Sequence, residues 1–139
     1  MSRTRVETRA RARVLQALYA WDVRGEKDLD RVATQIWDDL SVAPEERRLA
    51  SLLVGTLIQD GPELDRELIE VTMNWRLERL GVVDRCVLRL GAAELQRGET
   101  PPRVVIQEAV HLAERYGTLK SAKFVNGVLD ALARRMGRM

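Results

Sequence analysis

The sequence of 139 residues has little of the chemistry that enzymes use. It holds one cysteine, Cys86, and one histidine, His111, so no zinc cluster, Ser-His-Asp triad or Cys-His dyad is expected. Gly91, Gly98 and Gly117 are isolated and form no glycine-rich phosphate loop. We therefore expect a protein that is not an enzyme and that needs no metal or cofactor.

Long hydrophobic runs are also absent. No apolar run approaches the ~18–20 residues that a membrane-spanning helix needs. The N-terminus is basic, but it lacks the uninterrupted apolar stretch of a secretory signal. Cys86 cannot form an internal disulfide, and a small buried hydrophobe is favoured over a catalytic thiol. These features predict a cytoplasmic protein without a membrane segment.

What the sequence does have is a helical hydrophobic repeat along its whole length. Hydrophobic residues make up 45% of the chain and charged residues 32%, as in globular proteins. In the first segment Val14, Ala17, Leu18 and Trp21 follow the i, i+3, i+4, i+7 spacing of an amphipathic helix. The expected helices cover residues 5–23, 28–40, 44–59, 63–73, 82–96, 103–116 and a last segment from Ser121.

Local signals predict where several of these helices end. Asp60-Gly61-Pro62 is expected to break or kink the third helix. Gly117 suits the position after a helix end, and Ser121 suits the N-cap of the last helix. The helix over 82–96 is apolar on two stripes and is expected to be the most buried.

These helices predict the fold class. With six to seven helices, short connections and no strand signal, the chain is expected to be an all-α, compact, two-lobed bundle. The length fits one domain over residues 1–139, with helical subdomains at about 1–74 and 75–139.

Charge is unevenly distributed along the chain. The net charge is +2, yet residues 1–13 hold five arginines against one glutamate, a local +4. Residues 134–139 add three arginines, a local +3, and subtracting both ends from the total leaves −5 for residues 14–133. Basic ends on a mildly acidic body predict an anionic partner that engages those ends.

The first helix carries a candidate binding surface for such a partner. Arg5, Arg9 and Arg13 lie four residues apart on one stripe, with Arg11 as a further cation. Tyr19 projects within about 40° of Arg5 around the helix. Guanidinium groups neutralise phosphates, and an exposed aromatic ring can stack an unpaired base. From the residues alone, a solvated basic helix end with Tyr19 partly in the core is equally favoured.

A second candidate surface lies at the start of the last helix. Lys120 and Lys123 place two cations beside Phe124, at a helix N-terminus that itself attracts phosphate. The alternative places Phe124 in the core.

The last third of the chain holds the most distinctive motif. Asn126 and Gly127 are poor helix-interior residues within an otherwise helical repeat, which predicts a close backbone approach or a polar side chain facing a partner. The motif Lys123 to Asp130 occurs together with Gln16-Ala17-Leu18-Tyr19, Val87-Leu88-Arg89, Glu94-Leu95 and Glu108-Ala109-Val110. In this combination the chain resembles the NusB family of transcription antitermination factors.

The resemblance implies an all-helical, two-lobed protein that pairs with NusE, a small-subunit ribosomal protein. In the family, the pair binds boxA, a single-stranded RNA element of leader transcripts. The complex helps RNA polymerase to resist termination, notably in ribosomal RNA synthesis. Some family members self-associate, so the resemblance leaves a homodimer open.

The resemblance also assigns RNA-contacting residues. The arginine-rich first helix, Tyr19, Lys123 and Phe124 correspond to the family's RNA-contacting surface. Lys120 occupies a position that is acidic in other members, which favours RNA binding here. Gln107 stands where Asn is usual before Glu-Ala, a departure that we expect to affect a local hydrogen bond.

A separate set of residues corresponds to the family's NusE-binding surface. Asp84 matches the acidic residue that meets cationic side chains of NusE, and Glu78 and Arg85 flank it. Two other functions stay open: a helical protein-interaction scaffold without direct RNA binding, and an accessory domain of an RNA-modification system.

Overall fold

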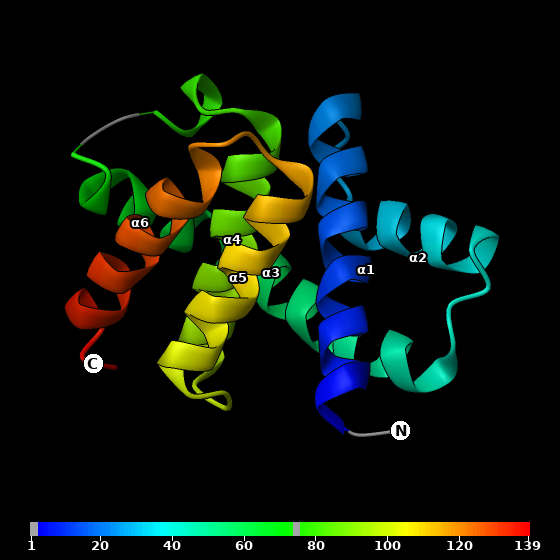
Figure 1. Cartoon of the computed structure of the whole chain (residues 1–139). Helices are drawn as coiled ribbons and strands as arrows, with labels where there is room; N and C mark the ends of the chain where they lie inside the picture. The colour runs from blue at the N-terminus through cyan, green and yellow to red at the C-terminus, as the bar shows by residue number, and fades with distance from the viewer. Residues whose placement is uncertain (1–2, 74–75) are drawn as a thin grey trace. The chain divides into compact units, whose positions relative to one another are not determined.

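The computed structural model describes residues 3–73 and 76–139, and within these ranges it is all helical. The all-α fold class predicted from the sequence is confirmed (Figure 1). No helix in the described ranges combines the length and the apolar character that crossing a membrane requires. The elements are α1 (Arg3–Arg24), α2 (Leu29–Asp39), α3 (Pro44–Val71), the 3-10 turn η1 (Leu77–Arg79), α4 (Val82–Arg97), α5 (Pro102–Tyr116) and α6 (Ser121–Arg135).

The chain forms two compact units, Met1–Gln59 and Asp60–Met139. Their boundary lies within α3, whereas the sequence analysis placed the division near residue 74. The boundary coincides with Asp60-Gly61-Pro62, where the sequence predicts a break or a kink, although the helix itself runs through it.

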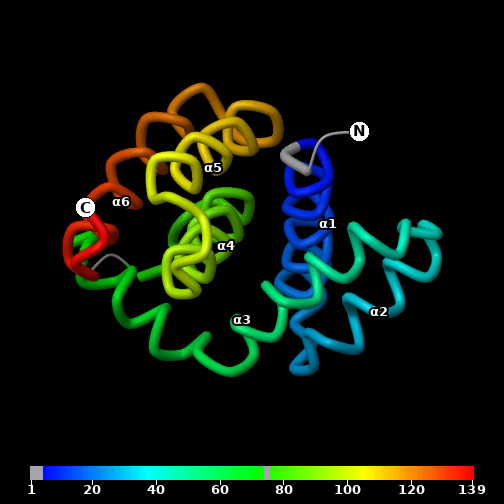
Figure 2. The backbone as a smooth tube through the Cα atoms, turned by 90° about the horizontal axis from the view of Figure 1, so that it is seen from below, coloured from blue at the N-terminus to red at the C-terminus, as the bar shows by residue number. Residues whose placement is uncertain are grey.

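In the N-terminal unit α2 lies against α1 (Figures 1 and 2). Val14, Leu18 and Val32 are fully buried there, as the spacing of apolar residues predicted. Asp28 caps α2, since its Oδ1 accepts a hydrogen bond from the backbone N–H of Arg31 at 3.1 Å. These contacts make α1 a rigid support for the side chains on its other face.

In the C-terminal unit α5 and α6 both pack on α4 (Figure 2). Nine of the ten α4 residues from Cys86 to Leu95 are buried, which confirms the prediction for this helix. At Gly91 a Cβ would lie 2.6 Å from Cδ1 of Leu129 on α6. The glycine at this position therefore allows α4 and α6 to approach closely.

The prediction of a close approach at Gly127 is wrong. A Cβ added to Gly127 would meet nothing within 4 Å, and the residue is exposed. Asn126 beside it is exposed as well. The second half of that expectation, a polar side chain available to a partner, stays a prediction.

At Asp60-Gly61-Pro62, where the sequence predicts a break or a kink, the helix does not break, because α3 continues through Pro62. Proline removes one backbone hydrogen bond and its ring crowds the carbonyl four residues earlier, here that of Ile58. Pro62 and Ile58 are both exposed, so water can solvate the freed carbonyl. Burial of Leu64 and Leu68 on the opposite side favours continuing the helix.

The turn between α5 and α6 differs from the predicted capping. The N-cap of α6 is Lys120, which makes no side-chain cap, while the buried Ser121 accepts a hydrogen bond from the N–H of Thr118 at 2.9 Å. The helix α5 ends at Gly117 as expected. A Cβ on Gly117 would lie 2.5 Å from the Ser121 Oγ, so the turn requires a residue without a side chain there.

Candidate nucleic-acid interface

The exposed face of α1 is the first candidate surface. Arg5, Gln16, Tyr19 and Val23 are exposed, and helical geometry puts them within one narrow sector opposite the buried Val14. Tyr19 is 47% exposed, so about half of its surface is open to solvent. The ring is thus both accessible and partly packed, and its role in RNA binding stays a prediction.

Sequence reasoning missed Gln16 as part of this face. Gln16 lies within about 20° of Arg5 around the helix, and its Oε1 accepts a hydrogen bond from Nη1 of Arg13 at 3.3 Å. An amide side chain at this place could hydrogen-bond the edge of a base or a phosphate oxygen. The helical spacing that identified Tyr19 would also have found it.

Two arginines of the stripe share one carboxylate. The Nε atom of Arg13 lies 3.5 Å from Oε1 of Glu46, and the Nε atom of Arg9 lies 3.8 Å from Oε2. Glu46 is in the first turn of α3, far from α1 in sequence, so no local pattern predicted this contact. Beside it, a hollow of about 320 Å³ is lined by Arg9, Glu46 and Arg48, among others.

Arg11 does not share this exposed face. It is 4% exposed, whereas Arg5 is exposed and Arg9 is half-buried. Arg11 sits about 120° from Arg5 around the helix, which places it away from the exposed face. Because its guanidinium is buried, it has little surface with which to reach a phosphate. Arg11 is therefore not among the direct RNA contacts that we propose.

The second candidate surface belongs to the C-terminal unit, at the start of α6. Lys120 and Lys123 are exposed, and Phe124 is half-buried, between the two positions considered from the sequence. No side chain caps this end of α6, which leaves backbone N–H groups for an anion. The hydrogen bond from Thr118 to Ser121 holds the turn that presents them.

The candidate partner-binding residues lie around the start of α4. Asp84 is half-buried in the first turn, and it forms no ion pair with any residue that the structure describes. Glu78 is exposed and lies 3.7 Å from Arg76, Oε1 to Nη1. Nη1 of Arg85 donates a hydrogen bond to the carbonyl of Leu80 at 2.9 Å and so supports the turn before α4.

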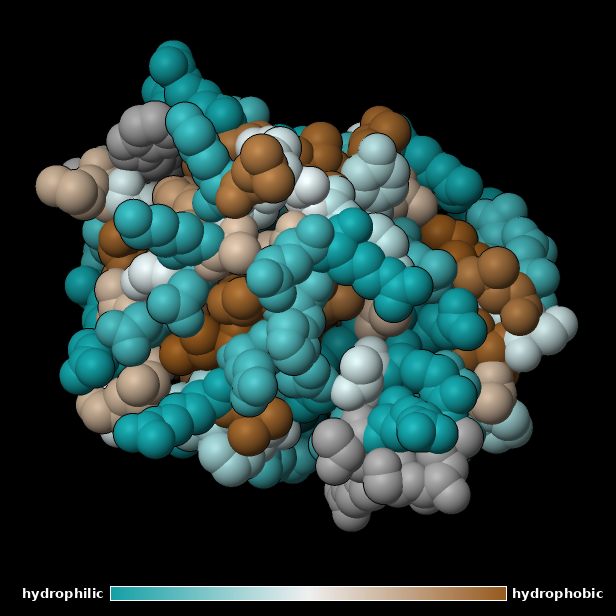
Figure 3. Space-filling model, in the orientation of Figure 1, coloured by the Kyte–Doolittle hydropathy of each residue, from teal (hydrophilic) through white to brown (hydrophobic). Residues whose placement is uncertain are grey.

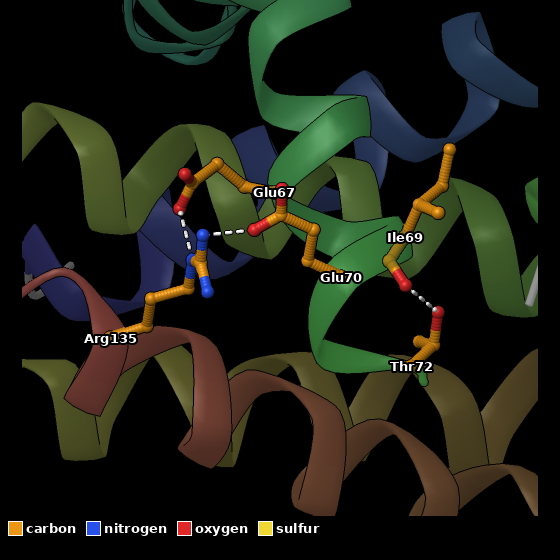
Figure 4. A network of polar contacts seen from close by, with 5 residues as sticks. All are labelled: Glu67, Ile69, Glu70, Thr72 and Arg135. Carbon is orange, nitrogen blue, oxygen red and sulfur yellow. Dashed lines mark hydrogen bonds and ion pairs between the residues drawn. The ribbon is translucent and has the colours of Figure 1, made fainter. Parts of the chain in front are cut away.

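The basic C-terminus is used differently from the expectation. Arg135 pairs with Glu67 at 3.2 Å and with Glu70, which joins α6 to α3 (Figure 4). Arg134 pairs with Asp130 at 3.0 Å, and Arg138 donates to the carbonyl of Gln96 at 3.1 Å. These contacts reduce the positive charge that this end displays, but exposed ion pairs are weak, so an anionic partner at this end stays a prediction.

The surface as a whole offers polar contacts. On the face shown in Figure 3 hydrophilic side chains predominate, and hydrophobic ones form small separate patches. Among the residues that the structure describes, no group of three His, Cys, Asp or Glu side chains could hold a metal ion. The described parts of the chain thus define an all-helical protein whose candidate sites are charged and aromatic binding surfaces.

Comparison with known proteins identifies the family. The model of the NusB family matches residues 8–134. The transcription antitermination protein NusB of Sorangium cellulosum is 43% identical over 130 residues, which cover 93% of this chain and 92% of the relative. The protein of the same name from Anaeromyxobacter dehalogenans strain 2CP-1 is 45% identical over 129 residues, or 91% of this chain and 89% of the relative.

Solved structures agree with the sequence matches. T. maritima NusB is 35% identical with a TM-score of 0.85, and the match covers 92% of this chain and 90% of that one. A crystal structure of antitermination factors NusB and NusE in complex with dsRNA has 31% identity and a TM-score of 0.85, with coverages of 94% and 98%. The chain therefore belongs to the NusB family. Members of this family are transcription antitermination factors and not enzymes. The predicted resemblance to the NusB family and the prediction that the protein is not an enzyme are therefore confirmed.

Proposed function

We propose that this protein pairs with NusE and binds single-stranded boxA RNA in leader transcripts. Within an RNA polymerase antitermination complex in the cytoplasm, it would promote ribosomal RNA transcription. The observation that carries the proposal is the exposed face of α1, where Arg5 and Tyr19 are both open to solvent. A related NusB has been crystallised with NusE and dsRNA, which supports this pairing.

The α1 face suits a single strand of RNA. Arginine side chains follow a phosphate backbone and give an affinity that depends on salt but not on sequence. The ring of Tyr19 offers a platform for an unpaired base, which a duplex would not supply. Arg5, Arg9, Arg13 and Tyr19 are therefore the proposed RNA contacts of the N-terminal unit.

At the start of α6, Lys120 and Lys123 would bind further phosphates. Both are exposed, and the uncapped helix end adds backbone N–H donors. The half-buried Phe124 could contact a base with its exposed edge while its other side stays in the core. This surface would extend the RNA contacts into the C-terminal unit.

Asp84 is the proposed contact for NusE. Its carboxylate has no ion-pair partner among the residues described, so a cationic side chain of a partner can pair with it without displacing one. Glu78 adds a second negative charge upstream, and Arg85 holds the turn between them.

Binding of labelled boxA RNA, followed by fluorescence anisotropy with and without NusE, tests the proposal. A scrambled RNA of the same length and composition is the control. We expect weak, salt-sensitive binding by the chain alone and tighter, boxA-selective binding with NusE. Equal binding of both RNAs in the presence of NusE would contradict the proposal, and NusE binding without any RNA binding would favour the scaffold alternative.

A further inference from the structure

Glu46 is an acidic residue that lies next to the proposed RNA-binding surface. It is 9% exposed, in the first turn of α3, and it faces the arginine stripe of α1. Its neighbour Arg47 pairs with Asp38 and lies 6.0 Å from the ring of Trp37, so the start of α3 is held against α2. The side chain of Glu46 is therefore held in place beside these arginines of α1.

The contacts of this carboxylate are long. At 3.5 and 3.8 Å they exceed the roughly 2.7–2.9 Å of a charge-assisted hydrogen bond, so the attraction is mainly electrostatic. Both contacts use the Nε atoms of Arg13 and Arg9. The side chains of Arg9 and Arg13 are still 41% and 28% exposed, which leaves part of each accessible from solvent.

We infer that Glu46 is an internal counter-charge that lowers the affinity of the α1 stripe for RNA phosphates. This inference rests on the proposed RNA-binding function. The carboxylate of Glu46 offsets one of the two positive charges of Arg9 and Arg13, which both approach it. A phosphate that approaches Arg9 or Arg13 is attracted by the arginines and repelled by Glu46.

Burial makes this repulsion effective. A charge with little solvent around it is screened less than an exposed one. Because phosphates are the same in every sequence, Glu46 lowers the affinity for all RNAs by a similar factor. The proposed stacking of an unpaired base on Tyr19 does not depend on this charge and keeps its contribution. The result is weaker binding through phosphates, while the stacking contribution is unchanged.

The substitution Glu46→Gln tests this, because it removes the charge and keeps the shape of the side chain. Glu45→Gln is the matched control: it is in the same helical turn, changes the net charge equally, and starts from an exposed residue with no ion pair among the described residues. We expect Glu46→Gln to bind boxA and scrambled RNA about three to ten times more tightly at low salt. The control should change affinity less than about twofold.

A double-mutant cycle separates an electrostatic role from a structural one. If Glu46 acts through Arg9, the gain from Glu46→Gln should shrink in an Arg9→Ala background. The plot of log affinity against log salt should also steepen for Glu46→Gln, by up to about 0.7 for each added phosphate contact. A merely structural role would lower the unfolding temperature without steepening this slope. Glu46→Asp, which withdraws the charge from the arginines, should give an intermediate gain.

Two failures are distinguishable. If Arg5→Ala and Tyr19→Ala leave RNA affinity unchanged, the proposed α1 surface is wrong. If these two variants weaken binding, but Glu46→Gln binds RNA no more tightly than Glu45→Gln, the surface stands and the counter-charge inference is overturned.

Discussion

Replacing Tyr19 with alanine tests the RNA surface with a magnitude that the structure supports. A base stacked on an aromatic side chain contributes about 1–3 kcal/mol, so Tyr19→Ala should raise the Kd for boxA RNA by about 5- to 150-fold. The ring is accessible for stacking because Tyr19 is 47% exposed. The loss should affect unpaired bases and leave the dependence of log affinity on log salt unchanged, since no phosphate contact is removed.

The same substitution should leave the protein folded. Burying a large apolar side chain completely stabilises a fold by about 1.5–3 kcal/mol, and Tyr19 is only about half buried, so the loss is about 1 kcal/mol. Domains of this kind have unfolding free energies of about 5–15 kcal/mol. Thermal unfolding measured beside the RNA titration will show whether a change in affinity reflects the contact or the folded fraction.

Two matched variants make the result specific. Tyr19→Phe keeps the ring and should keep nearly all of the affinity. Val23→Ala removes exposed apolar surface from the same face of α1, where Val23 is 58% exposed, and should change affinity by no more than about twofold. If Tyr19→Ala binds boxA RNA as wild type does, or no worse than Val23→Ala, the stacking argument is refuted.

Three further predictions test the charges and the packing. Replacing Arg5 and Arg9 together with alanine should lower the slope of log affinity against log salt by roughly 1.4 and weaken all RNAs alike, and an unchanged slope would remove the stripe from the site. Asp84→Lys should weaken NusE binding by a few kcal/mol, measured by calorimetry, and should leave RNA binding by the isolated chain intact. If Asp84 only interacts with the helix dipole, the substitution should lower the unfolding free energy by about 0.3–1 kcal/mol and leave NusE binding unchanged. In denaturant titrations Gly127→Ala should raise the unfolding free energy by up to about 1 kcal/mol. The unfolding free energy of Gly91→Ala should be about 1–3 kcal/mol lower than that of Gly127→Ala, because the new Cβ meets Leu129. Equal unfolding free energies for the two variants would contradict the packing described at Gly91.

How much could be predicted from the sequence depended on whether the signal was local. Helix positions followed from the spacing of residues such as Val14 and Leu18, because one buried face requires that period. The helical angle put Arg5 and Tyr19 on one side of the helix, but it left open how far Tyr19 is exposed. A helix break at Pro62 did not occur; the local rule counts the lost hydrogen bond and not the tertiary burial around it.

Close packing and ion pairing could not be predicted in this way. Gly127 and Gly91 look alike in sequence, and only the position of Leu129 distinguishes a glycine that is needed for space from one that is not. Likewise the contact of Glu46 with Arg9 joins two segments by tertiary folding, and no spacing rule connects them.

The two basic ends of the chain show why local charge alone is a poor guide to a binding surface. Both ends carry an excess of arginines, and both led to the same prediction of an anionic partner. At the C-terminus Arg135 has two carboxylates, those of Glu67 and Glu70, so the fold neutralises the charge that the sequence displays. On α1, Arg9 and Arg13 both approach the carboxylate of Glu46, which belongs to another helix. The charge that a segment offers to an anionic partner is what remains after the fold's own carboxylates are counted, and those carboxylates are brought in by tertiary contacts that a local count of arginines does not include.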